Sequence, residues 1–394
     1  MHSESRSLAR RALAIAGLFA LAALSPVSHA SWSESLSDWF NENMIDAEDG
    51  KVDISDYLSG ATGFFPAPII ITEPALGFGA GVAVAYFHPP QDIDDAVHPH
   101  RGPPSISVGF GAGTDNGTTL FGGAHSGVWR NDHVRYLGAI ANADVKLRFY
   151  PNTGPQGASE DGIGFNVDGV FFFQQLQFRL RESSWWLGGS YLYINADNSF
   201  DLGGDPGDGL PNPLATFEQG GLGAFVEYDG RDSTFTPTKG LKGILEVRNY
   251  DKAWGSDFDY DHIAMSLQHF TPFGDYSSFG VRLEAEAVSG DVPFFGYPYV
   301  NLRGIPALRY QGEEVIVAEV EYLWGVTPRW TLAIFGGGGV TTPVDAFAAQ
   351  RETVAAGGLG FRYRIARKLR LQIGMDVARG PEETAFYLTM GNAW

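Results

Sequence analysis

The sequence predicts an all-β protein: a 16-stranded antiparallel transmembrane β-barrel with a short N-terminal amphipathic helix. Three observations predict this class. Apolar residues alternate with polar or small ones at a period of two along most of the chain after residue 63. Many of these segments run for 10 to 13 residues, whereas an average globular strand has about 5–6. The joints alternate between short turns and long loops, as in outer-membrane barrels.

The composition agrees with this class. The 394 residues include 51 glycines and no cysteine, and aromatic residues make up 13% of the chain. The aromatic content argues against disorder, and no later segment has the run of about 20 apolar residues that a transmembrane helix needs. The lack of cysteine excludes disulfides and thiolate chemistry. The net charge of −19 argues against a nucleic acid partner, since phosphate binding needs basic patches.

The first thirty residues resemble a secretion signal. Arg6, Arg10 and Arg11 form a basic start, and the apolar run 12–24 follows before a small-residue site that ends at Ala30. The run is too short to span a bilayer, and the pattern is that of a cleaved signal peptide. We therefore expect residues 1–30 to be removed after Ala30 and the mature chain to reach the cell outer membrane. A retained anchor is the alternative.

Residues 31–63 form a predicted N-terminal periplasmic segment. Its first part, 31–44, places apolar side chains on one side of a helix. These are Trp32, Leu36, Trp39, Phe40 and Met44. The helix could pack on the periplasmic mouth of the barrel or at the membrane surface, or it could plug the lumen.

The acidic stretch 46–53 follows this helix. It resembles half of a calcium-binding loop, but Ile45 and Ala47 occupy the first two ligand positions. We therefore interpret it as a solvated acidic turn.

Residues 64–394 form the predicted barrel, whose strand number is even as in single-chain bacterial barrels. The predicted strands are 64–72, 77–87, 105–113, 118–129, 134–149, 163–181, 185–196, 219–228, 240–251, 259–271, 278–289, 313–324, 329–338, 353–365, 368–379 and 384–394. Pro66 and Pro68 in the first strand cannot donate to a ladder. Because the first strand must close against the last, we expect a weakly bonded seam between them.

The alternating faces predict which side meets lipid. Leu176, Phe178 and Leu180 alternate with glutamines and arginines, and we expect the apolar face of each strand to point outward and the other face to line a watery lumen. A soluble β-sandwich also alternates, but strand length and a tryptophan girdle favour the membrane barrel. Six of the nine tryptophans flank short turns or the C-terminus: Trp129, Trp185, Trp186, Trp324, Trp330 and Trp394.

A search for catalytic, cofactor or metal sites finds no candidate, and we expect a protein that is not an enzyme. His98 and His100 lie in a proline-rich loop and lack carboxylates at ligand spacing. The glycine run 336–339 resembles a dinucleotide loop, but no helix follows it. The carboxylates of Glu284 and Glu286 alternate with Arg282, which favours an ion-pair lining over acid/base chemistry.

Several motifs resemble the BamA/TamA outer-membrane insertase and translocase superfamily, also called bacterial surface antigens. Leu302-Arg303-Gly304-Ile305 is similar to the inward-folded loop motif of that family, although Ile305 replaces the usual aromatic residue. Like the family motif, it lies in the sixth external loop, after the eleventh predicted strand. The acidic segment 317–323 is similar to the twelfth strand of the family, and 376–394 to its last hairpin.

The resemblance implies roles for particular residues. Glu321 matches the carboxylate that pairs with the loop arginine in the family, with Glu319 nearby, so Arg303 and Gly304 would form an inward latch loop. A second acidic partner, expected in the next strand, is replaced within the glycine run 336–339. Gly391 would kink the last strand, and Trp394 would be the barrel-insertion signal. Arg303 as an exposed loop residue is the alternative to the latch.

The resemblance also implies a function in outer-membrane biogenesis or in translocation of protein or lipid. The partners would be outer-membrane lipid, the barrel assembly machinery during insertion, and a protein or lipid client. The periplasmic POTRA domains typical of the family are missing, because only 31–63 precede the barrel, fewer than the roughly 50 residues of a domain. A passive or structural outer-membrane pore is the alternative function.

Overall fold

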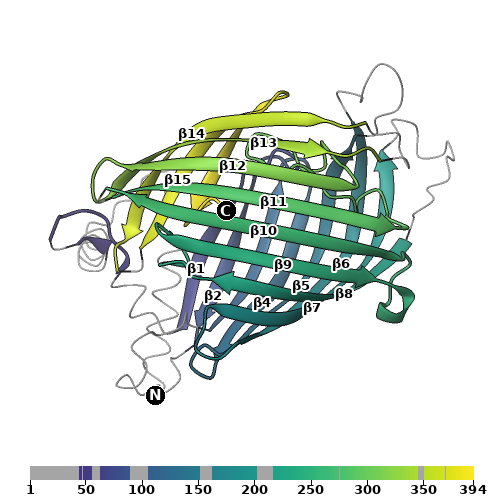
Figure 1. Cartoon of the computed structure of the whole chain (residues 1–394), viewed down its shortest axis with the longest axis horizontal. Coiled ribbons are helices and arrows are strands. Elements are labelled where there is room, and N and C mark those ends of the chain that lie inside the picture. The colour runs from purple at the N-terminus through teal and green to yellow at the C-terminus, as the bar shows by residue number, and fades with distance from the viewer. Residues whose placement is uncertain are drawn as a thin grey trace, which may run out of the picture.

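A computed structural model describes residues 44–46, 48–55, 63–88, 105–150, 162–201, 216–274, 276–344, 350–368 and 370–394. It shows the predicted fold, a sixteen-stranded antiparallel barrel (Figure 1). The strands are β1 Gly63–Ile71, β2 Gly79–Phe87, β3 Ile106–Thr114, β4 Thr119–Trp129, β5 Val134–Phe149, β6 Ile163–Arg179, β7 Trp185–Asp201, β8 Thr216–Asp229, β9 Gly240–Tyr250, β10 Tyr260–Phe273, β11 Ser277–Gly290, β12 Glu314–Gly325, β13 Trp330–Thr341, β14 Thr353–Ala366, β15 Leu371–Arg379 and β16 Thr384–Met390. A short 3₁₀ helix, η2, spans Lys252–Trp254.

Each strand pairs with its sequence neighbours, from β1 with β2 to β15 with β16. No ladder between β1 and β16 is present among the described strands, so the barrel is nearly closed rather than sealed. The first and last strands face each other across a gap in the wall. We call this gap the seam. One end of the barrel holds the short turns, the start of β1 and the end of β16. We call it the short-turn end, and the other the loop end.

The lumen of the later strands is polar, as the alternation predicts. On β12, Glu319 and Glu321 are buried while Ile316 and Val320 are exposed on the outer surface. On β6, Gln177 is buried and Phe178 is exposed. The outer surface of these strands is a wide apolar patch. Soluble proteins rarely expose so large an apolar patch to water, so this surface suits contact with lipid.

The predicted orientation is wrong for β3. Phe165 of β6 packs against the lumenal residue Leu308, and directly paired residues of a ladder share a face. Phe165 pairs with Leu147 on β5, so the odd-numbered residues of β5 face inward. Ala139 of β5 pairs with Ala124 of β4, and Ala124 pairs with Val108 of β3, so Val108 also points into the lumen. The outward face of β3 is made mostly of glycine. Neither face of β3 is charged, so alternation alone could not tell them apart.

The tryptophan girdle is only partly right. Trp185, Trp324 and Trp330 are exposed on the outer face near the short turns. Trp186 points inward and is 1% exposed, with the guanidinium groups of Arg135 and Arg179 at 4.2 and 4.6 Å from its ring. These cations stabilise the buried ring from the lumen side.

The acidic turn docks on the short-turn end of the barrel. Arg329, in the turn before β13, is 2% exposed and donates to Asp49 at 2.7 Å and to Asp53 at 2.7 Å. The chain is also tied by Ile54 N, which donates to Ile365 O at 2.7 Å. The interpretation as a solvated turn is therefore wrong for Asp53, which is buried. The predicted helix 31–44 lies almost wholly outside the described residues, as do the signal peptide and the histidine pair.

Replacing Trp186 by alanine should destabilise the barrel by about 3–5 kcal/mol, because it leaves a cavity against two cations. Trp185→Ala is the matched control: Trp185 is adjacent and 48% exposed, so its loss should cost less than about 1.5 kcal/mol. The measurement is the free energy of unfolding from urea titration in detergent. Equal losses for the two variants would contradict the assigned faces.

Arg329→Gln should release the acidic turn from the barrel. Hydrogen bonding to Arg329 lowers the pKa of Asp49 from 3.8 to about 2, so docking should persist above pH 4 and weaken as pH falls toward 2. At neutral pH the variant should be cleaved in 46–55 roughly tenfold faster by protease, through local opening. Arg351→Gln removes an exposed arginine at the loop end and is the control. Unchanged cleavage of Arg329→Gln would show that backbone contacts alone hold the turn.

Candidate functional site

The loop between β11 and β12, residues 291–313, folds into the barrel. Val300, Leu302 and Ile305 are each at most 4% exposed and pack against Val315, Val317 and Val354 of the wall. Ile305 therefore serves as a core residue at the position where the family motif has an aromatic. This packing sets the loop backbone against β12–β14 and aims Arg303 at the lumenal carboxylates.

Arg303 is brought together with both predicted carboxylates. Its Nε and Nη2 donate to Glu319 Oε1 at 2.9 and 2.8 Å, and its Nη1 donates to Glu321 Oε2 at 2.7 Å. Both carboxylates are nearly fully buried. These are charge-assisted bonds, which are stronger than neutral ones. The geometry excludes the exposed-loop alternative for Arg303.

A third carboxylate completes the site, and sequence reasoning did not assign it. Asp376 of β15 is fully buried and accepts from Arg303 Nη1 at 2.7 Å. It also accepts from both terminal nitrogens of Arg362, at 2.5 and 2.9 Å. The resemblance predicted the second acidic partner in the strand after β12, whereas it comes from β15. The sequence signal for Asp376 was its place on the polar face of an alternating strand, which predicts that it points into the lumen.

Two further groups surround Arg303. Arg282 of β11 donates to Glu319 at 2.9 Å and to the carbonyl of Asn301 at 2.7 Å, which fixes the loop as well as the strand. The ring of Phe335 on β13 lies 3.5 Å from the guanidinium carbon of Arg303. We call Arg303, Arg282, Arg362, Glu319, Glu321 and Asp376 the ion network. Its three arginines pair with its three buried carboxylates, and Arg282 also donates to Glu284 at 3.1 Å.

The glycine run makes room for the loop. A Cβ on Gly339 would lie 2.4 Å from Val300, and one on Gly337 would lie 2.9 Å from Leu302. The loop therefore sits where β13 has no side chains. Gly304 has a φ of +94° at the loop tip, a conformation that glycine adopts without strain.

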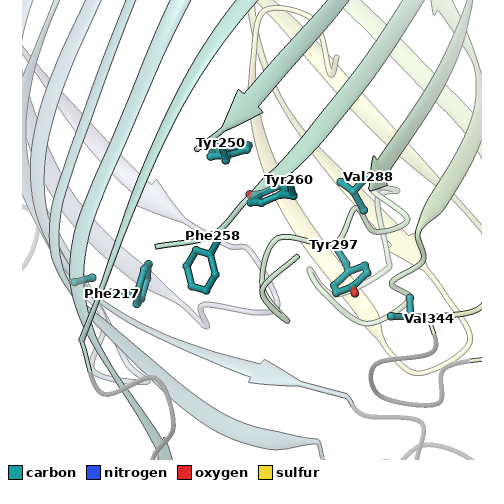
Figure 2. Close-up of a cluster of buried hydrophobic side chains, with 8 residues drawn as sticks. Phe217, Tyr250, Phe258, Tyr260, Val288, Tyr297 and Val344 are labelled. Atoms are coloured by element: carbon teal, nitrogen blue, oxygen red, sulfur yellow. The ribbon is translucent and has the colours of Figure 1, made fainter. Parts of the chain in front are cut away.

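An aromatic cluster lies at the loop end of the lumen (Figure 2). Tyr250 and Tyr260 stack at 4.2 Å between ring centroids. Tyr297 and Val344 bring the sixth and seventh loops into the same cluster as Phe217 and Phe258. Burial of such rings removes a large apolar area from water. The β11–β12 loop is therefore held by apolar packing at Tyr297 and by ion pairs at Arg303.

The seam is held loosely. Pro66 and Pro68 lie in β1 opposite Val84 and Val82 of β2, and proline is confined to edge strands because it lacks an N–H. Across the seam, the described contact is Leu388 N to Thr72 Oγ1 at 3.4 Å. This is a long bond, and β1 is therefore anchored to the wall mainly through β2.

The inward loop reaches both sides of the seam at the loop end. Gly304 N donates to the hydroxyl of Tyr387 on β16 at 2.8 Å. On the other side, Glu73 follows β1, and burial raises the pKa of its carboxyl, with Glu383 adding to the rise and Ala307 of the loop opposing it through a backbone hydrogen bond. The loop thus bridges the gap that the strands leave open.

The last residues turn into the lumen. Gly391 has a φ of +84°, and its N–H donates to Gln372 O at 2.7 Å just after β16 ends. Trp394 then packs on Phe270 at 5.7 Å between centroids, and a Cβ on Gly280 would meet it at 2.7 Å. The prediction that β16 runs to Trp394 and presents it in the girdle is wrong, because Gly391 bends the chain inward. Its role as an insertion signal stays a prediction.

The described part of the chain contains no group of three or more histidines and carboxylates placed to hold a metal ion. No helix within it is long and apolar enough to cross a membrane. The site consists of charge pairing and packing.

Solved structures share this fold. BamA from Haemophilus ducreyi lacking POTRA domains 1–3 matches with a TM-score of 0.54 at 12% identity, over 92% of this chain and 78% of that one. CdiB from Acinetobacter baumannii matches at 0.54 and 10%, over 83% and 59%, and CdiB from Escherichia coli at 0.50 and 13%, over 82% and 61%. The chain spans about three fifths of the CdiB chains. No family model and no curated protein matches the sequence.

These likenesses establish that the chain has the β-barrel fold of BamA and CdiB. At such low identity they concern the fold alone.

Arg303→Met should destabilise the barrel by about 3–5 kcal/mol, because it leaves three buried carboxylates facing two arginines. Arg379→Met is the control, since Arg379 is exposed and bonds Thr384 at 3.2 Å, and it should cost less than about 0.5 kcal/mol. The measurement is urea unfolding in detergent.

The same pair of variants should differ in planar bilayers. Arg303→Met should show larger and more frequent conductance steps than the wild type, because the loop is freed from β12 and β15. Identical stability and conductance of Arg303→Met and Arg379→Met would show that the network does not hold the loop.

Proposed function

We propose that this protein acts in outer-membrane biogenesis or in the translocation of protein or lipid, as a barrel whose seam opens sideways while the inward loop stays latched. The proposal includes no catalytic chemistry and no cofactor. The short-turn end would face the periplasm and the loop end the outside, with outer-membrane lipid around the wall and the barrel assembly machinery as the partner during insertion. The client would be a protein or a lipid.

The single observation that supports this proposal most is the unequal bonding around the barrel. The ladder runs unbroken from β1 to β16, and the gap falls where β1 carries Pro66 and Pro68. A weak edge inside a bilayer is costly, because unpaired backbone groups have no water to bond. Retention of such a costly edge is consistent with a function that requires the barrel to open at this position. The shared fold with BamA and CdiB agrees with a protein that works in the outer membrane.

A passive pore is the second candidate. It is favoured by a cavity of about 290 Å³ inside the lumen at the short-turn end. It is opposed by the inward loop and by the aromatic cluster, which both occupy the lumen toward the loop end. The conductance of the wild type and of Arg303→Met separates the two functions: a steady, large wild-type channel favours the pore.

Locking the seam should abolish the proposed function. The chain has no cysteine, so Thr72→Cys with Leu388→Cys places one thiol on each side of the seam. The oxidised variant should reproduce the growth and envelope defects of a deletion strain, and a reductant should reverse them.

The matched control is Val377→Cys with Phe386→Cys, a directly paired and outward-facing position between β15 and β16. This cross-link lies within a ladder and leaves the seam free, so function should be kept. Full function in the oxidised seam variant, with the cross-link verified by mass spectrometry, would rule out sideways opening.

A further inference from the structure

Three arginines gather at the short-turn end of the lumen, on strands that do not contribute to the ion network. Arg135 lies at the start of β5, Arg179 at the end of β6, and Arg231 just after β8. The guanidinium groups of Arg135 and Arg179 lie over the inward ring of Trp186, so both are on the lumenal side of the wall. The three arginines line one cavity of about 190 Å³. We call it the arginine cavity.

Two aspartates hold the three guanidinium groups through the same edge. Nε and Nη2 of Arg135 donate to the two carboxylate oxygens of Asp132 at 2.6 and 2.8 Å. Arg179 uses the same two nitrogens: Nε donates to the carbonyl of Asp132 at 2.9 Å, and Nη2 donates to its carboxylate. Nε and Nη2 of Arg231 donate to Asp229 at 2.9 and 3.0 Å. The planes of the guanidinium groups are therefore set before a ligand arrives, which lowers the entropy cost of binding.

This group of side chains carries a net positive charge. It consists of three arginines and two aspartates, and Asp132 is shared by two of the arginines. Glu227 of β8 forms an ion pair with Lys242 at 3.9 Å, so that pair adds no net charge. The side chains of Arg135 and Arg179 are 27% and 26% exposed. A solute in the lumen can therefore reach both.

The arginine cavity has room for a small oxyanion. A water molecule takes up about 30 Å³, so a phosphate ion fits together with a few waters. Ser184, Ser233 and Thr234 add hydroxyl groups to the lining, and a hydroxyl can donate to an ionised oxygen or accept from a protonated one. The carboxylate of Asp229 also belongs to the lining, where both of its oxygens accept from Arg231.

The arrangement suits phosphate better than a carboxylate. Guanidinium groups match the geometry of phosphate oxygens, and three of them, held at fixed positions, can bind different oxygens of one tetrahedral ion. A carboxylate offers only two oxygens and would leave part of the set unused. The charge-assisted bonds that phosphate would gain are stronger than neutral ones.

We propose that the arginine cavity binds the phosphate group of a water-soluble molecule, either free phosphate or a small phosphate monoester. Nη1, on the other edge of each guanidinium, would donate to the phosphate oxygens while Asp132 and Asp229 keep their bonds. The cavity faces the lumen rather than the bilayer, so its ligand arrives through water at the short-turn end. This inference goes beyond the proposed function and holds whether or not the seam opens.

Isothermal titration calorimetry of the detergent-purified chain tests the site with three probes at equal ionic strength: inorganic phosphate, glycerol 1-phosphate and acetate. At least one of the two phosphates should bind with a Kd below about 1 mM and at least about tenfold more tightly than acetate. Tighter binding of inorganic phosphate would assign the free anion, and tighter binding of glycerol 1-phosphate would assign a monoester. Acetate binding as tight as that of both phosphates, or no saturable phosphate binding, would overturn the proposal.

Variants locate the ligand. Arg135→Gln should weaken phosphate binding about tenfold, and it should fold because Asp132 keeps its bonds to Arg179. Arg135→Lys keeps the charge without the planar fork and should bind within about threefold of the wild type. The matched control is Arg181→Gln: Arg181 is exposed, close to Arg179 in the sequence and outside the cavity lining, so its loss should change binding less than about twofold. Equal weakening by Arg135→Gln and Arg181→Gln would overturn the assignment.

Hydrogen exchange gives a second measurement, which uses the wild type and therefore does not require a variant to fold. Arg231, Ser233 and Thr234 belong to the β8–β9 turn, residues 230–239. Saturating phosphate should slow amide exchange in this turn at least about threefold, because a bound ligand suppresses local opening. Unchanged exchange there would contradict the location. The oxidised seam variant, Thr72→Cys with Leu388→Cys, should bind phosphate as tightly as the wild type, so failure of this site and failure of sideways opening are separate results.

Discussion

A guanidinium inside a barrel must be surrounded by carboxylates, and this requirement of Arg303 organises half of the molecule. Arginine cannot lose its proton in a protein, so the inward loop can stay in the lumen only if the wall supplies negative charge. β12 supplies Glu319 and Glu321, and β15 supplies Asp376. Those carboxylates in turn need Arg282 and Arg362. The loop, β11, β12, β14 and β15 are thereby tied into one unit that no single strand could form alone.

Much of the fold was predictable because the bilayer imposes a simple rule on each strand. A strand with lipid outside and water inside alternates at a period of two, and the number of strands and the position of nearly every turn follow from it. The side that faces lipid is predictable only where one face is charged, as on β12. On β3 both faces are uncharged, and the ladder partners of Val108 decide the matter through contacts more than fifty residues away.

The candidate site was predictable only in its local part. The pairing of Arg303 with Glu321 could be expected because the loop motif resembles the inward-folded loop of a known family and because Glu321 lies on the inward face of its strand. Asp376 is 73 residues from Arg303, and nothing in its own segment marks it as a partner. The docking of Asp53 on Arg329 spans 276 residues, and an acidic turn reads as solvated until its partner is known. The inward position of Trp394 was not predicted, because it depends on packing against Phe270 and Gly280, which are more than one hundred residues away in the sequence.

The two sides of the seam differ in how firmly they are held, and this difference would decide which side moves in the opening that we propose. β16 is paired with β15, which the ion network fixes through Asp376, and Tyr387 accepts a bond from the loop. β1 pairs only with β2, and its prolines give it no donors at two positions. In the opening that we propose, β1 is therefore the strand that leaves. Its departure would leave the buried charges paired, so the proposed opening of the barrel to lipid does not require any of the costly ion pairs to break.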